Sequence, residues 1–376
     1  MLKPFIRKAA VSNTAEKEMR VIIAGGGTGG HLFPGIAVAR ELEKRYGAAD
    51  IRFVIGRRKM ESEILARLGY ARYTIQAEGI KGRGRRQGFM VLLRLPYSLL
   101  QSLFILRRFS PHLVLGVGGY SSGPVCVAAR IMGIPTAIHE QNSFPGLTNR
   151  LLARVVDRVL ISWDVSREHF SGKAPCLTGN PVREELLARA NDFKGTDKGF
   201  TVLVVGGSLG ARAVNRAFTA ALEIMKVKGK TPHVIHQSGE TDYSRVIEDY
   251  KERGIHGDIV PFIKDMAAAY GRADMVVGRA GATTVSELAA LGKPSILVPY
   301  PFAANRHQEV NALMLAQGGG AEIILENDLS GETLSELLMK YMDDKKALEE
   351  MGKRAAKVGR HDAAKVIVDQ LEAMKK

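Results

Sequence analysis

The feature that most restricts the fold is a local pattern that occurs twice, about 180 residues apart. An apolar run at residues 19–24 meets the glycine-rich stretch 25–30 and then a helical pattern at 36–45. Residues 200–210 repeat the run and the glycines, and a helical pattern follows at 211–227. A strand, a glycine turn and a helix open a βαβ unit. We therefore predict an α/β protein with two Rossmann-like, doubly wound parallel-sheet domains and a cleft between them.

Shorter apolar runs between the helical patterns are typical of parallel strands. They occupy residues 51–55, 113–117, 136–139, 159–162, 234–236, 275–278 and 295–298. Asn180-Pro181 lies between the repeats and is the expected hinge. The expected N-terminal domain is 19–182 and the expected C-terminal domain is 183–360. Residues 1–18 are expected to be a disordered extension, and the last helix, about 361–376, to pack on either domain, including back on the first.

The net charge is confined to one half of the chain. Lys plus Arg total 54 against 39 Asp plus Glu, a formal +15. Up to Val182 there are 27 cations and 12 anions, and from Arg183 onward there are 27 of each. Such an excess indicates nucleic acid, an acidic lipid surface or a polyphosphate as partner, or an ordinary solvated face. Nucleic acid fits poorly, because aromatic residues are only 6% and no reader motif accompanies the charge.

The most asymmetric region is 79–139, which has eight cations and no acidic residue. Its apolar part, 89–106, contains Arg94, Pro96 and Gln101, so as a membrane span it would bury a charge. We expect it to lie on a membrane surface instead. The N-terminus lacks the apolar core of a secretory signal, which predicts a cytoplasmic protein. The residues expected at the membrane are Arg85, Arg86, Phe89, Leu103, Phe104, Arg107 and Arg108.

The first glycine loop contains the dinucleotide spacing Gly25-x-Gly27-x-x-Gly30. The strand at 51–55 runs into Gly-Arg-Arg-Lys rather than an acid, which disfavours NAD and leaves an NADP-type site open. In either case, backbone N–H groups at a helix N-terminus can approach an anion. His31 follows the loop directly, and two roles are open for it: a general base, or a brace for the loop.

Two further glycine turns, at 206–208 and 278–284, favour phosphate binding. In the last turn, Thr284 and Glu287 have capping-box spacing, and the alternative is that Glu287 binds a ribose diol. Asp-x-Asp and Walker motifs are missing, which disfavours metal-dependent sugar transfer and NTP hydrolysis. His233 and His236 flank a buried strand and are interpreted as structural.

Six motifs in this order resemble the MurG family of bacterial N-acetylglucosamine transferases. They are Gly26-Gly-Thr-Gly-Gly-His31, Gly118-Gly-Tyr-Ser-Ser-Gly-Pro124, His139-Glu-Gln-Asn142, Gly179-Asn-Pro-Val-Arg183, Gly206-Gly-Ser-Leu-Gly-Ala211 and Gly281-Ala-Thr-Thr-Val-Ser-Glu287. The resemblance implies a GT-B fold and inverting transfer of GlcNAc from UDP-GlcNAc to the 4-hydroxyl of MurNAc in lipid I, giving lipid II. The alternative is a GT-B glycolipid synthase with a diacylglycerol acceptor.

The resemblance also implies roles for individual residues. His31 is the candidate general base, and the acceptor diphosphate would lie at Gly118, Gly119, Tyr120, Ser121 and Ser122. The implied donor-binding residues are Thr28, Gly29, Gly30, Asn142, Arg183, Ser208, Ile263, Ala282, Thr283, Thr284, Val285, Ser286, Glu287 and Gln308.

By the same resemblance, no cofactor is required and a divalent metal is at most stimulatory. The implied partners are UDP-GlcNAc, lipid I, an anionic membrane surface and the cell-wall and division machinery. The enzyme is expected on the cytoplasmic face of the bacterial inner membrane as a peripheral protein. Its expected role is peptidoglycan biosynthesis, and through it cell shape and division.

Overall fold

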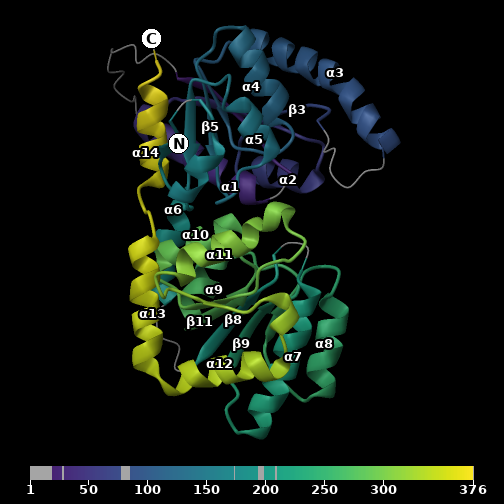
Figure 1. Cartoon of the computed structure of the whole chain (residues 1–376), viewed down its shortest axis with the longest axis vertical. Coiled ribbons are helices and arrows are strands. Elements are labelled where there is room, and N and C mark those ends of the chain that lie inside the picture. The colour runs from purple at the N-terminus through teal and green to yellow at the C-terminus, as the bar shows by residue number, and fades with distance from the viewer. Residues whose placement is uncertain are drawn as a thin grey trace, which may run out of the picture.

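The computed structural model describes residues 19–27, 29–77, 85–172, 174–193, 199–207 and 210–375, and only the backbone of residues 85–94, 191 and 193. The predictions for residues 1–18, Thr28 and Ser208 lie outside the described residues, as do those for the side chains of Arg85, Arg86 and Phe89. The described chain forms two α/β domains, one above the other in Figure 1.

The N-terminal domain is built on a seven-stranded parallel sheet with the order β3-β2-β1-β4-β5-β6-β7. The chain reverses its winding between β1 and β4, so the turns that follow these two strands are neighbours. The strands are β1 (Arg20–Ala24), β2 (Asp50–Ile55), β3 (Ala71–Thr74), β4 (Leu113–Gly116), β5 (Thr136–Glu140), β6 (Arg158–Ile161) and β7 (Cys176–Leu177). The helices are α1 (Gly29–Tyr46), α2 (Lys59–Arg67), α3 (Arg85–Phe109), α4 (Ser122–Ile131), α5 (Leu147–Leu152) and the 3-10 helix η1 (Asp164–His169).

The C-terminal domain repeats the plan with six parallel strands in the order β10-β9-β8-β11-β12-β13. The strands are β8 (Thr201–Val205), β9 (His233–Gln237), β10 (Asp258–Val260), β11 (Met275–Gly278), β12 (Ser295–Leu297) and β13 (Glu322–Ile323). The α-helices are α6 (Glu184–Arg189), α7 (Arg212–Val227), α8 (Tyr243–Glu252), α9 (Met266–Arg272), α10 (Ala282–Leu291), α11 (His307–Ala316), α12 (Gly331–Asp343) and α13 (Lys345–Val358), and the chain ends with α14 (Ala363–Glu372). Three short 3-10 helices complete it: η2 (Ala190–Phe193), η3 (Ala304–Arg306) and η4 (Glu326–Asp328).

Alternate residues of each strand enter different cores, because successive side chains point to opposite faces of a sheet. In β1, Val21 and Ile23 pack with α1 and α2, whereas Ile22 and Ala24 pack with α3, α4 and α5. The second sheet is covered in the same way, by α7 and α12 on one face and by α10, α11 and α13 on the other. Both faces of both sheets are therefore buried, which confirms the prediction of two doubly wound domains.

Sequence reasoning missed four strands, β3, β7, β10 and β13, and each of them is at or next to the edge of its sheet. They are short and only partly buried, so they lack the apolar run that marks the central strands. Two helix starts were also predicted too late. Helix α1 begins at Gly29 rather than near residue 36, and α10 begins at Ala282, inside the glycine turn predicted for 278–284, because both helices start directly out of their glycine turns.

The last helix, α14, lies against the N-terminal domain, although α13 before it belongs to the C-terminal one (Figure 1). Ile367, Val368 and Leu371 are fully buried in the same core as α1. Burial of such side chains contributes roughly 1.5–3 kcal/mol each. The chain thus crosses between the domains twice, near residue 180 and near residue 360.

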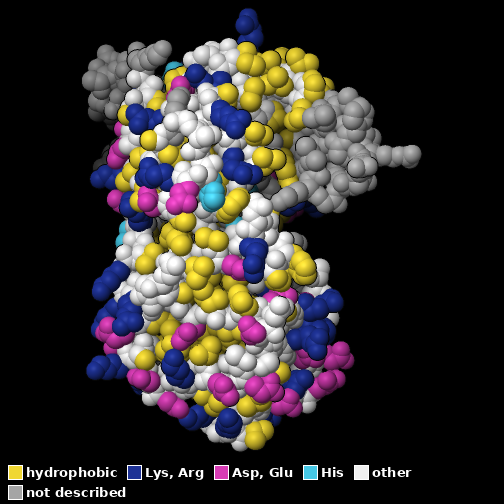
Figure 2. Space-filling model, viewed as in Figure 1, with side chains coloured by type: hydrophobic (Ala, Val, Ile, Leu, Met, Phe, Trp, Pro, Cys, Tyr) yellow, Lys and Arg dark blue, Asp and Glu magenta, His cyan; other side chains and the backbone are white. Residues whose placement is uncertain are grey.

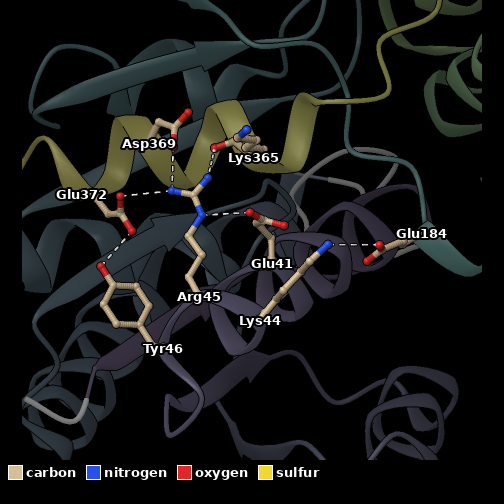
Figure 3. A network of polar contacts seen from close by, with 8 residues as sticks. All are labelled: Glu41, Lys44, Arg45, Tyr46, Glu184, Lys365, Asp369 and Glu372. Atoms are coloured by element: carbon tan, nitrogen blue, oxygen red, sulfur yellow. Dashed lines mark hydrogen bonds and ion pairs between the residues drawn. The ribbon is translucent and has the colours of Figure 1, made fainter. Parts of the chain in front are cut away.

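Arg45 joins α1 to α14 by polar contacts (Figure 3). Its guanidinium lies 2.6 Å from Asp369 and 3.1 Å from Glu372, and it also donates to the Lys365 carbonyl. Glu41 holds the other edge of the guanidinium at 2.8 Å. The contact fixes the end of the chain to the domain in which the chain began.

In the ranges that the structure describes, no helix is long and apolar enough to cross a membrane.

His236 is buried in the C-terminal core, as its interpretation as a structural residue requires. Its ring contacts Asn215 Oδ1 and Tyr250 Oη, each at 3.0 Å. Burial lowers the pKa of His236 from 6.5 to about 3. Between these two values the unfolded chain takes up a proton that the folded chain excludes, so the free energy of unfolding falls as the pH falls.

We expect His236→Gln to flatten the pH dependence of stability, by about 1.4 kcal/mol per pH unit between pH 5.5 and 4.5. The absolute stability falls as well, because Asn215 and Tyr250 lose a partner. The measurement is urea unfolding followed by circular dichroism at several pH values. An unchanged slope would contradict the assignment of His236 as a neutral core residue.

Candidate functional site

Two glycine turns of the N-terminal domain touch each other at the carboxyl ends of β1 and β4. The Gly26 N–H donates to the Gly118 carbonyl at 3.3 Å. Gly26, Gly27, Gly118 and Gly119 all have positive φ, and a Cβ on Gly119 would overlap the Gly26 carbonyl. Only glycine on both sides permits this approach of backbone to backbone. The result is a pair of turns next to the N-termini of α1 and α4.

His31 lies in the first turn of α1, half-buried, beside this pair of turns. Its Nδ1 is 2.9 Å from Gln141 Oε1, which follows β5. A Cβ on Gly118 would come within 2.8 Å of the same ring nitrogen. The imidazole is therefore held between Gln141 and the second glycine turn. Sequence reasoning named His31 and missed Gln141, although it lies within the quoted motif at 139–142.

Glu61 of α2 is a second residue that sequence reasoning missed. Its carboxylate is completely buried, and Oε1 accepts a hydrogen bond from the Gly27 N–H. The other oxygen, Oε2, has no partner among the described residues. Burial raises the pKa of Glu61, against the lowering effects of the Gly27 N–H, Arg58 and His31. No motif marks an acid on a short helix as a support for a distant loop, and only the fold brings the two together.

The predicted acceptor-diphosphate residues lie together at the start of α4. Ser121 is the N-cap residue and makes no side-chain cap, while Ser122 Oγ donates to the Gly119 carbonyl at 2.9 Å. Ser122 is buried and Tyr120 is exposed. A helix N-terminus without a side-chain cap leaves backbone N–H groups for an anion. The arrangement is suited to a phosphate, and the specific contacts stay a prediction.

In the C-terminal domain the corresponding helix start is that of α10. Gly281 is its N-cap residue, again without a side-chain cap, so the capping-box interpretation of Thr284 and Glu287 is wrong. The helix begins two residues before Thr284, which leaves Thr284 inside the first turn. Thr283 Oγ1 donates to the Gly30 carbonyl at 3.2 Å, which joins the starts of α10 and α1 across the two domains. Ala282, Val285 and Ser286 are buried.

Glu287 is buried with both carboxylate oxygens bonded. Oε1 is 3.0 Å from Arg183, and Oε2 accepts from the Tyr270 hydroxyl at 3.1 Å. Burial raises the pKa of Glu287 and the pKa of Tyr270, while Arg183 opposes both shifts. Arg183 also stacks at 4.4 Å on the ring of Phe33 in α1. The two predicted donor residues thus bind each other at the domain junction, and their contacts with ribose and diphosphate stay predictions.

Of three other predicted donor residues, Asn142 contacts the opposite domain, while Gln308 and Ile263 bond within their own domain. The Asn142 side chain donates to Glu140 and lies 3.5 Å from Asn311 of α11. The Gln308 side chain accepts from the Tyr300 N–H, and the Ile263 N–H donates to Gln237 Oε1 at 2.9 Å. Ser143 was missed: its hydroxyl donates to Asn311 Oδ1 at 2.7 Å and ties the loop after β5 to the other domain.

Of the residues predicted for a membrane surface, Phe104, Arg107 and Arg108 are exposed on α3, whereas Leu103 is half-buried against the core. The structure adds apolar residues that sequence reasoning did not select, and most of them come from α4, α5 and the residues directly after α5. Figure 2 shows hydrophobic side chains gathered over this part of the molecule. The apolar face is made of Leu100 (63% exposed), Phe104 (66%), Ile131 (64%), Leu147 (63%), Leu151 (54%) and Val155 (46%).

Comparisons with known proteins match this architecture along the chain. The models of the glycosyltransferase family 28 N-terminal and C-terminal domains match residues 21–161 and 201–367. A relative from Syntrophus aciditrophicus is 45% identical over 95% of this chain and 99% of its own length, and one from Geobacter sp. (strain M21) is 47% identical over 93% and 95%. Both are named UDP-N-acetylglucosamine–N-acetylmuramyl-(pentapeptide) pyrophosphoryl-undecaprenol N-acetylglucosamine transferase.

Among solved structures, Acinetobacter baumannii MurG superposes with a TM-score of 0.74 at 30% identity, covering 94% of this chain and 99% of that one. The UDP-GlcNAc 2-epimerase from Neisseria meningitidis, bound to UDP-GlcNAc, gives 0.67 at 15% identity, covering 94% and 100%, and shares the fold alone. The prediction of a GT-B fold is confirmed.

Gly118→Ala is expected to lower turnover by at least about tenfold. The new Cβ costs roughly 1–2 kcal/mol at a φ of +91° and would push against the His31 ring. Gly123→Ala is the matched control, because a Cβ there meets only the Thr148 methyl at 3.4 Å. Steady-state rates of both variants test this. Equal rates for Gly118→Ala and the wild type would show that the position of His31 does not depend on this turn.

Proposed function

The chain belongs to glycosyltransferase family 28, and from this premise we propose that it transfers GlcNAc from UDP-GlcNAc to the MurNAc 4-hydroxyl of lipid I. The products are lipid II and UDP. The observation that carries the proposal is the similarity to relatives of that name, 45–47% identical along almost the whole chain. The junction of two doubly wound domains, where α1, α4 and α10 begin at glycine turns, supports it.

In the proposed mechanism, His31 takes the proton of the MurNAc 4-hydroxyl while that oxygen attacks the anomeric carbon of GlcNAc. The bond from the anomeric carbon to the β-phosphate oxygen breaks, and its electron pair leaves with UDP. The sugar is inverted, and the imidazolium then returns its proton to solvent. His31 suits this role because it is half-exposed at the junction and its ring is held at Nδ1.

The charge that develops on the departing diphosphate needs positive partners. We propose that the N-terminus of α10, with Gly281 as its N-cap residue, meets this charge through backbone N–H groups. By the family resemblance, Arg183 and Ser208 would also contact this diphosphate. Because dipoles and hydrogen-bond donors take this part, we propose that a divalent metal is at most stimulatory. The acceptor diphosphate would bind at the other uncapped start, that of α4.

The direct test is incubation with UDP-[14C]GlcNAc and a short-chain lipid I analogue in EDTA. Labelled disaccharide-lipid is the expected product. His31→Ala should lower turnover by about 100- to 10,000-fold, the usual contribution of a general base. A parallel reaction offers UDP-glucose and diacylglycerol. Product in that reaction alone would replace the proposal by the diacylglycerol alternative, and normal turnover of His31→Ala would remove only the role of the base.

We propose further that the apolar face of α3, α4 and α5 lies on an anionic membrane, at its cytoplasmic side. Exposed apolar side chains at this density mark an interaction site in an otherwise polar surface. Arg107, Arg108 and Arg154 are exposed on the same helices or directly after them. A lipid-linked acceptor is presented from such a surface, so the face and the proposed acceptor site belong to the same domain. Cell-wall and division proteins that share this surface would be partners.

Reversal of Arg107 and Arg108 to Glu should weaken binding to phosphatidylglycerol vesicles by at least about 30-fold, at roughly 1 kcal/mol per cation. Lys228→Glu with Lys251→Glu changes the net charge equally on the C-terminal domain, where both lysines are exposed, and should bind vesicles normally. Sedimentation with vesicles measures binding, and affinity for UDP-GlcNAc reports on the fold. If both double variants lost vesicle binding equally, the effect would come from net charge alone and not from the position of Arg107 and Arg108.

A further inference from the structure

A chain of hydrogen bonds runs from His31 into the core of the N-terminal domain and ends at the linker between the domains. His31 Nδ1 is 2.9 Å from Gln141 Oε1, and Gln141 Nε2 is 3.1 Å from His139 Nδ1. His139 Nε2 is 3.0 Å from the carbonyl of Gly179, the residue before Asn180-Pro181. Gln141 and His139 are each only 1% exposed, so water does not compete for these groups.

The carbonyls of Val117 and Gly179 contact this chain of hydrogen bonds. Because a carbonyl can only accept, the two carbonyls determine which atoms of the hydrogen-bond chain carry protons. Gln141 Nε2 donates to the Val117 carbonyl at 2.9 Å, so the amide nitrogen lies on that side and Oε1 faces His31. His139 Nε2 must carry a proton for Gly179, which leaves His139 Nδ1 as an acceptor for the second amide hydrogen, together with the His139 carbonyl at 3.3 Å. His31 Nδ1 must then carry the proton that Oε1 accepts.

In neutral His31 the lone pair is therefore on Nε2, which has no hydrogen-bond partner among the described residues. We propose that Gln141 is a positioning residue that holds His31 as the Nδ1–H tautomer, and that His139 holds the Gln141 amide in the orientation that this requires. The proposal rests on the proposed function, in which His31 is the base. A base has to offer an unprotonated nitrogen to the acceptor hydroxyl. The hydrogen-bond chain leaves Nε2 of His31 as that nitrogen before substrate binds.

The groups around His31 are consistent with a neutral, ordered arrangement. Burial lowers the pKa of His139 to about 4, so His139 stays neutral at physiological pH and keeps its donor toward Gly179. From α2, Glu61 interacts electrostatically with His31, and burial raises the pKa of that carboxyl. Arg58, at the start of α2, donates to the Gly27 carbonyl on the other side of the glycine turn. Among the described residues, Gln141 is the hydrogen-bond partner of Nδ1.

The test compares two substitutions that act on the pH profile of kcat/KM in opposite directions. Gln141→Met keeps the size of the side chain and removes the acceptor, so the imidazolium loses a partner and the acidic limb moves to lower pH. Gln141→Glu places a carboxylate beside Nδ1, which favours the imidazolium and moves that limb to higher pH by about one unit. A purely structural role of Gln141 would lower activity in both variants without opposite shifts.

The expected loss of kcat for Gln141→Met is about 10- to 100-fold, within the contribution of a general base, with little change in KM for UDP-GlcNAc. In a His31→Ala background the same substitution should cost nothing further, since the group that it orders is gone. An equal loss in the two backgrounds would overturn the proposal. The proposal would also be overturned if the acidic limbs of both Gln141 variants stayed at the wild-type pH. Circular dichroism and UDP-GlcNAc affinity show whether both variants are folded.

Gln237→Met is the matched control. Gln237 is also a buried glutamine at the end of a strand, and it too supports a glycine turn, through the Gly207 carbonyl at 3.1 Å. It lies in the other domain and makes no contact with His31. We expect it to change KM for UDP-GlcNAc and to leave the acidic limb in place. Failure of the proposed function is separate: it would appear as a wild-type enzyme that makes no lipid II, or as a His31→Ala variant with normal turnover.

Discussion

The approach of two glycine turns in the N-terminal domain is the contact on which the site depends. Gly26 and Gly118 come close enough for their backbones to hydrogen-bond, and a single methyl on Gly119 would overlap Gly26. This approach brings the start of α1 beside the start of α4. It also leaves the space that the His31 ring fills, between Gly118 and Gln141. The backbone contact thus brings the histidine, the two helix N-termini and the buried glutamine together, and the hydrogen bond from His31 to Gln141 then holds the ring.

The C-terminal domain supplies the same kind of turn without a histidine. Its contact with the first domain is polar and specific: Thr283 bonds to Gly30, Asn311 bonds to Ser143, and Arg183 lies between Phe33 and Glu287. The chain crosses between the domains twice, and α14 packs into the first domain with three buried aliphatic side chains. These contacts at residues 30, 143 and 183 therefore join the two domains next to the proposed base.

The uneven charge of the chain matches the proposed roles of the two domains, donor binding in the C-terminal one and acceptor binding in the N-terminal one. The C-terminal domain, with as many anions as cations, takes a soluble donor in the proposed function and meets it with helix N-termini. The N-terminal half carries the whole +15. It also carries the apolar face of α3, α4 and α5, and both features suit an acceptor held in an anionic leaflet. In Figure 2 acidic side chains gather on the lower, C-terminal half of the molecule.

The sequence by itself determined the two domains, their central strands and the three glycine turns, because burial on both faces and the need for positive φ leave residue patterns that can be read locally. It also pointed to His31, which follows a turn at a helix start. It did not indicate Gln141, Glu61 or Ser143 as parts of the site, and it left open a capping box at Thr284 that the structure excludes, because these roles depend on partners 34 to 168 residues away in the chain or on where a helix begins. The edge strands, the packing of α14 and the apolar face from three helices were likewise decided only in the tertiary structure. Each of them depends on which surfaces the fold brings together, and no local pattern of residues records that.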